Sequence, residues 1–330
     1  MKIAPALIFR ISLIFGILLG APASSDAGAI VAWGYDGFGA ISNAPSGTGF
    51  TAITGINLAA CALRANGSIA AWGYDGDGQV SNVPSGTGFT AIAGGGDTGF
   101  ALRANGSISS SGNDTFGQVS NTPSVNNFTA IAAGGGNGYS LRANGSIAAW
   151  GYDAYRQVSN VVSGTGFTVI AAGEYNGYAL RANGSIAAWG YDADGEVSNV
   201  PSGNNFVAIA GGAYTAYALR SDESIAAWGQ DSNALVSNAP SGTGFSAIAA
   251  GLGNGYALRS NGSIAVWGYD GLGVVSNAPL GTGYTAIDGG TQVNGFALTG
   301  VPEPGSLVLM LVAGTAAFVR SFRQRSTVRE

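Results

Sequence analysis

Acidic residues at alternate positions form the densest group of side chains able to do chemistry: Asp192, Asp194 and Glu196. Carboxylates spaced in this way can converge on a hard cation, so calcium is the one cofactor that the sequence suggests. The spacing does not match an EF-hand loop. A glycoside hydrolase would need two carboxylates about 5–9 Å apart, on either side of the bond to be cleaved. The three acids fall on one local turn rather than across a cleft, so we rank an enzyme below a binding protein.

The residue types that the chain lacks exclude other chemistries. There is no His and a single Cys, Cys61, among 330 residues. Ser-His and Cys-His nucleophilic pairs, imidazole metal ligands and internal disulfides are therefore excluded. The formal net charge of −5 argues against a nucleic-acid partner, which would need a basic patch.

A second set of candidate residues lies in a loop that differs between copies of an internal repeat. These residues carry amide, carboxylate and aromatic groups, which suit sugar or protein surfaces. We assign them to ligand binding, with relaxed sequence constraint as the alternative. They are Asp97, Asn137, Glu174, Tyr175, Tyr214 and Asn254.

The elements that would position these residues follow from the repeat itself. Tryptophan recurs with a period of 39 residues at 33, 72, 150, 189, 228 and 267, and Ser111 fills the vacant slot, which makes seven copies. Each copy shows β-prone runs, and an Asn-Gly pair such as Asn105-Gly106 predicts a type I′ hairpin turn. We expect four short strands in each copy, the last being the weak Gln-Val-Ser-Asn run. The predicted fold is an all-β, seven-bladed β-propeller over residues 28–300.

The two ends of the repeat region predict how the ring closes. The last copy stops at Thr299, before its hairpin turn, and the first begins at Ala29, after that turn. Pairing of the N- and C-terminal strands would complete one blade and leave no open edge. A solenoid would instead need polar caps at both ends, and none is visible.

The repeat resembles that of the regulator-of-chromosome-condensation family. Ala101-Leu-Arg-Ala-Asn-Gly-Ser-Ile108 and Trp72-Gly-Tyr-Asp-Gly-Asp-Gly-Gln79 match its pattern, although the His that often precedes the Ala-Leu strand is missing. The resemblance implies a seven-bladed propeller. A secreted bacterial β-lactamase inhibitor protein of the same propeller type implies only that such a ring can bind a protein. The nucleotide-exchange role of the eukaryotic family does not transfer to an acidic, exported chain.

Residues 1–27 are typical of a secretory signal peptide. An apolar run from Ile11 to Gly20 is followed by small residues suited to cleavage, with a membrane anchor as the alternative. We therefore expect the propeller to be exported.

Residues 301–330 resemble a PEP-CTERM sorting signal of Gram-negative bacteria. Val301-Pro302-Glu303-Pro304 precedes an apolar stretch from Ser306 to Val319, and Arg320, Arg323 and Arg325 follow it. The stretch is short for a spanning helix, and the arginines would stay on the cytoplasmic side. The resemblance implies an exosortase-type processing enzyme as partner and delivery to the cell surface, outer envelope or extracellular polysaccharide matrix. Anchoring in the inner membrane by this helix would be transient or stable.

Loops should sort onto two faces of the ring, because strand direction alternates. One face would carry an Arg in six copies, either as a basic ring or as stems that cover apolar surface. The other would carry an Asp in every copy, which we expect to bond its own turn. The tryptophans should pack between blades, with Trp72 opposite Cys61.

These observations favour a non-enzymatic surface or matrix protein whose propeller is a scaffold for polysaccharide or protein. The alternative is a specific inhibitor or receptor-like binder of an exported protein.

Overall fold

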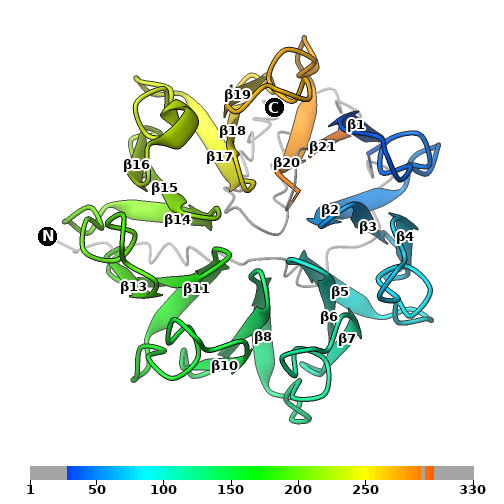
Figure 1. The fold of residues 1–330 in the computed structure, drawn as a ribbon, viewed down its shortest axis with the longest axis horizontal. Coiled ribbons are helices and arrows are strands. Elements are labelled where there is room, and N and C mark those ends of the chain that lie inside the picture. The colour runs from blue at the N-terminus through cyan, green and yellow to red at the C-terminus, as the bar shows by residue number, and fades with distance from the viewer. Residues whose placement is uncertain (1–27, 291–293, 301–330) are drawn as a thin grey trace, which may run out of the picture.

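Seven three-stranded antiparallel sheets are arranged as blades around a central axis (Figure 1). The protein is described by a computed structural model, which covers residues 28–290 and 294–300. Blades 1 to 6 are β2–β4, β5–β7, β8–β10, β11–β13, β14–β16 and β17–β19, each with its inner strand first. Blade 7 contains β20, β21 and β1. The predicted seven-bladed propeller is confirmed.

The strand bounds repeat closely from blade to blade. They are β1 Ile30–Gly34, β2 Phe50–Ile56, β3 Ala59–Arg64, β4 Ile69–Gly73, β5 Phe89–Gly94, β6 Thr98–Arg103, β7 Ile108–Gly112, β8 Phe128–Ala133, β9 Asn137–Arg142, β10 Ile147–Gly151, β11 Phe167–Ala172, β12 Asn176–Arg181, β13 Ile186–Gly190, β14 Phe206–Gly211, β15 Thr215–Arg220, β16 Ile225–Gly229, β17 Phe245–Ala250, β18 Asn254–Arg259, β19 Ile264–Gly268, β20 Tyr284–Asp288 and β21 Asn294–Thr299. A short 3-10 turn, η1, spans Ser232–Ala234.

Blade 7 is built from both ends of the repeat region. β1 pairs with β21 in a regular antiparallel register that runs from Ile30 opposite Leu298 to Gly34 opposite Asn294. The Thr299 N–H also donates to the Ala29 carbonyl at 3.0 Å. The first and last strands therefore pair as expected, and each covers an edge that the other would leave open.

The predicted fourth strand is wrong. The segment after each outer strand forms consecutive turns, because the Asp that follows the Trp strand captures its backbone N–H groups. In blade 1 the Asp75 Oδ1 accepts from the N–H groups of Val80 and Ser81 at 2.8 and 2.9 Å. The same pair of bonds occurs at Asp36, Asp114, Asp153, Asp192, Asp231 and Asp270. N–H groups that donate to a carboxylate are not available for hydrogen bonds to a neighbouring strand, so no fourth strand forms. The expectation that each Asp bonds its own turn is confirmed.

The Asn-Gly hairpins form, but not with the predicted type I′ turn. In blade 1, Gly67 has φ +75° while Asn66 keeps an ordinary backbone conformation. The Gly67 N–H donates to the Arg64 carbonyl at 2.8 Å, and the Asn66 Oδ1 accepts from the Ser68 N–H. This is a turn closed by a left-handed glycine, in which the Asn fixes the bend with its side chain.

The tryptophans pack between blades, as expected, although the predicted register was off by one residue. Trp72 lies opposite Ala60, and Cys61 lies opposite Ala71. Each Trp ring instead meets an aromatic ring of the preceding blade at 5.1–6.4 Å between centroids. Each indole N–H also donates to a carbonyl of that blade, as Trp189 does to Gln157 at 2.8 Å. This contact combines apolar burial with a satisfied indole donor and joins neighbouring blades.

One seam, between blades 1 and 2, lacks both aromatic partners. Ser111 stands where the other outer strands have Trp, and Cys61 stands where the other middle strands have Phe or Tyr. Ile56, at a position that is glycine in the other blades, is buried here. A Cβ on Gly99 would lie 2.9 Å from the Ile56 Cδ1, whereas a Cβ on the equivalent Gly177 would lie 2.2 Å from the Trp189 ring. Ile56 therefore occupies the space that a Trp ring fills elsewhere.

We predict that Ser111 and Ile56 are energetically coupled. Ser111→Trp alone should lower the free energy of unfolding by about 1–3 kcal/mol, because the new ring would overlap Ile56. Ile56→Ala alone should cost about 2–5 kcal/mol by leaving a cavity. The free energy of unfolding of the double variant should be about 1–3 kcal/mol higher than the value obtained by adding the two single losses. Urea unfolding of the four proteins measures this, and simple additivity would contradict it.

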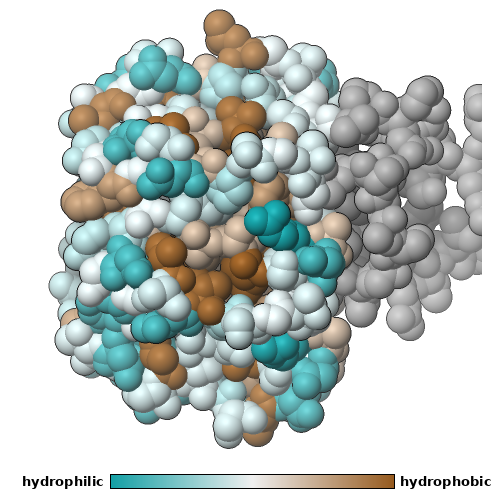
Figure 2. All heavy atoms as spheres, turned by 90° about the vertical axis from the view of Figure 1, so that its right-hand side faces the viewer, coloured by the Kyte–Doolittle hydropathy of each residue, from teal (hydrophilic) through white to brown (hydrophobic). Residues whose placement is uncertain are grey.

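Figure 2 shows the outer wall of the ring, where hydrophobic patches are interrupted by hydrophilic side chains. The apolar core lies mainly between adjacent blades, and its largest cluster runs from blade 3 to blade 6. In the part of the chain that the structure describes, no helix is long and apolar enough to cross a membrane. The predicted signal peptide and sorting signal, including its apolar stretch, lie outside the described residues.

Candidate functional site

The strand directions define two faces. The top face carries the loop after each inner strand and the turn after each outer strand. The bottom face carries the hairpins and the connections into the next inner strand. Both ends of the propeller lie at the bottom, because the Gly28 N–H donates to the Phe50 carbonyl and the Gly300 N–H donates to the Gly283 carbonyl. Gly28 and Gly300 therefore lie on the side opposite the top face.

The arginines on the bottom face have a packing role. Each guanidinium lies over the Phe ring at the start of the inner strand of its own blade, 4.0–5.4 Å from the ring centroid; the six are Arg64, Arg103, Arg142, Arg181, Arg220 and Arg259. Cation–π contact and the covering of apolar surface explain the series. The alternative that they cover apolar surface is thus supported over a basic ring for an anionic polymer.

Charge divides sharply between the two faces. Among residues 28–290 and 294–300, the bottom holds those six arginines with Asp222 and Glu223, while the top holds a single cation, Arg156. The acidic residues of the top are Asp36, Asp75, Asp77, Asp97, Asp114, Asp153, Glu174, Asp192, Asp194, Glu196, Asp231, Asp270 and Asp288. The top face is therefore strongly negative.

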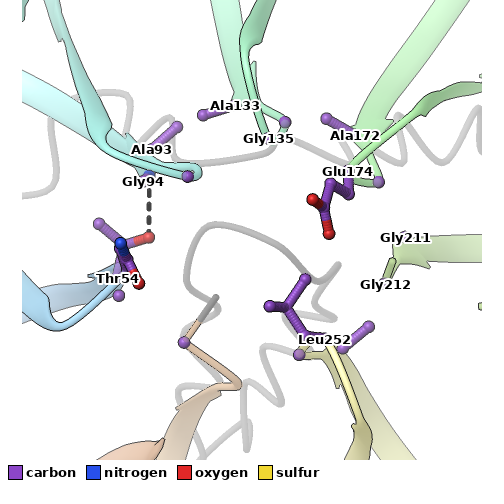
Figure 3. A pocket seen from close by; sticks show the side chains of 18 of the residues that line it. Thr54, Ala93, Gly94, Ala133, Gly135, Ala172, Glu174, Gly211, Gly212 and Leu252 are labelled. Atoms are coloured by element: carbon purple, nitrogen blue, oxygen red, sulfur yellow. Dashed lines mark hydrogen bonds between the residues drawn. The ribbon is translucent and has the colours of Figure 1, made fainter. Parts of the chain in front are cut away.

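Two of the predicted ligand-binding residues border a cavity on the axis of the ring. Asp97 and Glu174 line this space of about 220 Å³, whose wall is otherwise mostly glycine and alanine. The Glu174 and Leu252 side chains point into it (Figure 3). The Asp97 Oδ1 accepts from the side-chain amides of Asn57 and Gln79, so its carboxylate is held in place.

The assignment of Asn137 and Asn254 to a binding surface is wrong. Each is only 1% exposed and lies at the start of a middle strand. The Asn254 Nδ2 donates to the Tyr269 carbonyl at 2.7 Å, and Asn176 bonds the Tyr191 carbonyl in the same way. Thr98 and Thr215 make the equivalent bond from the same position in their blades, whereas the buried Asn137 amide has no hydrogen-bond partner among the described residues.

Tyr175 and Tyr214 do lie together on the top face, as part of a larger aromatic cluster that the sequence analysis missed. Their centroids are 5.5 Å apart, and both contact Tyr191, at 6.2 and 5.8 Å. Tyr155 packs against Tyr175 at 5.2 Å and against Tyr191 at 5.1 Å. Tyr152 and Phe116 extend the row. We call these six residues, which come from blades 2 to 5, the aromatic cluster.

The cluster is accessible and lies in a negative environment. Phe116 is 49% and Tyr155 41% exposed, and the other four rings are partly buried. Burial raises the pKa of the Tyr175 hydroxyl, and the neighbouring Glu174 carboxylate raises it further. Burial raises the pKa of Tyr191 as well, with Asp194 and Glu196 adding to the effect. Contiguous exposed aromatic patches are uncommon on protein surfaces, so this cluster is a candidate interaction site.

A signal for this cluster exists in the repeat. The second residue after the turn Asp differs in type from blade to blade: Phe38, Asp77, Phe116, Tyr155, Asp194, Asn233 and Leu272. This position varies as strongly as the loop after the inner strand. Comparing both positions across blades would have identified Tyr155.

The structure does not bring Asp192, Asp194 and Glu196 together as metal ligands. The Asp192 Oδ1 accepts from its own turn, the Asp194 Oδ2 accepts from the Gln230 Nε2 at 3.0 Å, and the Glu196 Oε2 accepts from the Asp194 N–H. Within the described ranges no group of three or more acidic or Cys side chains could hold a metal ion. Calcium binding remains an untested prediction without a site at these positions.

Asp288 is a buried carboxyl at the axis that the sequence analysis overlooked. It lines the cavity next to Thr54, at a strand position that is alanine in the other five blades. Its Oδ2 accepts from the Gly55 N–H at 2.8 Å, and the Thr54 Oγ1 accepts from the Gly94 N–H at 3.0 Å. Burial raises the pKa of Asp288 to about 7. Asp288 and Thr54 thus tie blade 7 to blade 1 and blade 1 to blade 2.

We predict that Asp288 makes stability depend on pH. Its pKa is about 7 in the folded chain, against an ordinary value of 3.8. The folded state therefore holds the proton over this interval, and stability falls as pH rises from about 4 to about 7. Asp288→Asn should flatten the change in melting temperature between about pH 5 and pH 8. Asp97→Asn, at another carboxyl of the same cavity, is the control. An unchanged slope in Asp288→Asn would contradict the prediction.

Comparisons with known proteins support the fold. No family model matches the chain, and no curated protein matches it. Yeast RCC1 (Prp20), in a structure with Kap60, is 16% identical with a TM-score of 0.69, covering 92% of this chain and 95% of its own. The ectodomain of the Physcomitrella patens receptor kinase CR4 is 21% identical with a TM-score of 0.63, covering 74% and 68%. Identities at this level show the fold alone. The chain is a seven-bladed β-propeller like that of RCC1.

Proposed function

We propose that this chain is an exported, non-enzymatic binding propeller that captures a partner protein with its top face. The observation that carries the proposal is the aromatic cluster. It is partly exposed, spans four blades, and lies on the face opposite the points where the flanking segments attach. Aromatic residues are enriched in protein interfaces, where they bury a large area at low entropic cost.

The frame of the propeller does not require these rings. The turn that carries Tyr155 is held by Asp153, and the equivalent turns of blades 4 and 5 keep the same bonds with Asp194 and Asn233 in its place. Top-face carboxylates such as Asp97, Asp153 and Asp194 accept hydrogen bonds from turns or side-chain amides, which fits binding better than acid–base catalysis. Neighbours in the comparisons agree with such a role, since one is a receptor ectodomain and another is bound to Kap60.

The cellular location is the second part of the proposal. Residues 1–27 would direct export, and residues 301–330 would be processed by an exosortase-type enzyme near Pro302-Glu303-Pro304. The propeller would then reside at the cell surface, in the outer envelope or in the extracellular matrix.

The binding role predicts a loss of partner capture when the cluster is removed. Full-length protein, a Tyr175→Ala/Tyr214→Ala variant and a Tyr269→Ala variant are immobilised and exposed to secreted proteins and extracellular polysaccharide of the producing bacterium. Tyr269 is the control, since it occupies the turn position of Tyr191 in blade 6 and is 42% exposed. We expect a partner protein that the wild type and the control retain and the double variant loses by about tenfold or more.

Two outcomes would overturn parts of this proposal. Equal retention by all three proteins would remove the top face as the binding site. Retention of polysaccharide alone, lost in the double variant, would keep the site and replace the proposed protein partner with a glycan. Melting curves of the three proteins establish that each is folded.

A further inference from the structure

The rings of the aromatic cluster are tilted against one another rather than coplanar. Interplanar angles among Tyr155, Tyr175, Tyr191 and Tyr214 run from 39° to 77°, with centroids 5.1–6.2 Å apart. The four rings therefore form no single flat platform. Tilted rings instead leave notches between one face and the next edge, and an aromatic face attracts a cation placed over it.

Carboxylates lie next to these rings in the chain. Glu174 directly precedes Tyr175 and lines the axial cavity, and Asp194 lies in the turn that follows Tyr191. Beyond the effect of burial, the charge of each carboxylate raises the pKa of the neighbouring tyrosine hydroxyl. Arg156 is the one cation of the described top face. Burial raises the pKa of Asp153, while hydrogen bonds from the Asp153 turn and then the charge of Arg156 lower it. The nearby negative charge therefore exceeds what Arg156 can offset, and it remains available to an incoming cation.

The extent of the cluster indicates the kind of cation. Its rings follow one another from Phe116 in blade 2 through Tyr152 and Tyr155 in blade 3 to Tyr214 in blade 5. A row of this length offers several notches, which suits an extended chain with repeated cationic side chains better than a single small amine. The opposite side of the ring carries no matching row among the described residues: Phe38 and Tyr74 form only an isolated pair there.

We propose that the aromatic cluster binds a lysine- or arginine-rich polypeptide segment of its partner. The cationic side chains would lie over the tyrosine faces, with Glu174 and Asp194 as their counter-charges. Complementary charge would also steer such a segment to the negative top face from a distance. The inference rests on the proposed function, because it specifies the chemistry of the partner that the same face captures.

The test measures binding of labelled octa-arginine and octa-lysine peptides to the full-length protein by fluorescence anisotropy. A neutral Gly-Ser octapeptide, an N-acetylglucosamine hexamer and a glucosamine hexamer are the comparison probes. The repeat supplies matched control variants. Tyr155→Ala/Tyr214→Ala is compared with Tyr269→Ala, and Asp194→Asn with Asp77→Asn. Asp77 and Asp194 are equivalent in the repeat and each accepts a side-chain amide of the next blade, at 3.2 and 3.0 Å.

We expect the cationic peptides to bind and the neutral peptide not to bind. The double tyrosine variant should weaken peptide binding by about tenfold or more, with Tyr269→Ala within about twofold of the wild type. Asp194→Asn should weaken it by about threefold or more, and Asp77→Asn should not. Tyr155→Phe should retain binding, since it keeps the ring, which separates loss of the site from loss of the fold.

Several results would overturn the inference. Peptide binding that ignores the tyrosine changes, or that falls equally in Asp77→Asn and Asp194→Asn, would reveal unspecific attraction to a negative face. Preference for either hexasaccharide would replace the basic segment with a sugar. A partner captured through the top face but not displaced by octa-arginine would leave the proposed function standing and remove this inference alone.

Discussion

At the glycine that follows most inner strands, adjacent blades approach one another so closely that a side chain has no room. A Cβ on Gly173 would lie 2.5 Å from the Gly212 carbonyl oxygen, and one on Gly212 would lie 2.7 Å from that of Gly251. At this separation neighbouring loops share backbone hydrogen bonds, such as the Glu174 N–H to the Gly212 carbonyl at 3.1 Å. The aromatic seams, the width of the central cavity and the arrangement of the top loops all depend on this approach. Blade 1, with Ile56, departs from it and repacks its seam.

Stability and recognition occupy different residues of the same repeat. The tryptophan seams, the turn aspartates and the arginine–phenylalanine contacts recur around most of the ring and satisfy the backbone and the core. The top-face positions beside them carry Tyr, Asp, Asn, Gly or Leu without changing the turn that holds them. A frame that keeps its turn bonds with these different side chains can present a new surface at little cost in folding. The aromatic cluster is one such surface.

Much of the fold was predictable because the 39-residue period, the hairpin signals and the incomplete first and last copies are local properties of the sequence. The fourth strand was not, since β-propensity in Gln-Val-Ser-Asn cannot reveal that the Asp75 carboxylate captures the N–H groups that a ladder would need. Two of the six residues of the aromatic cluster, Tyr175 and Tyr214, were predictable, because their loop differs between copies of the repeat. Their contact with Tyr155 and Tyr191 depends on the curvature of the ring, and the environment of Asp288 depends on ring closure, so neither is encoded in local spacing.

The close approach at the axis is tested most directly by two alanine substitutions in one loop. A Cβ on Gly251 would lie 2.5 Å from the Gly289 carbonyl oxygen, whereas a Cβ on Gly253 would meet nothing nearer than the Tyr269 Cβ at 3.4 Å. We expect Gly251→Ala to lower the free energy of urea unfolding by about 1–3 kcal/mol, and Gly253→Ala to change it by less than about 0.5 kcal/mol. Equal effects of the two substitutions would contradict the view that blade contact at the axis governs this structure.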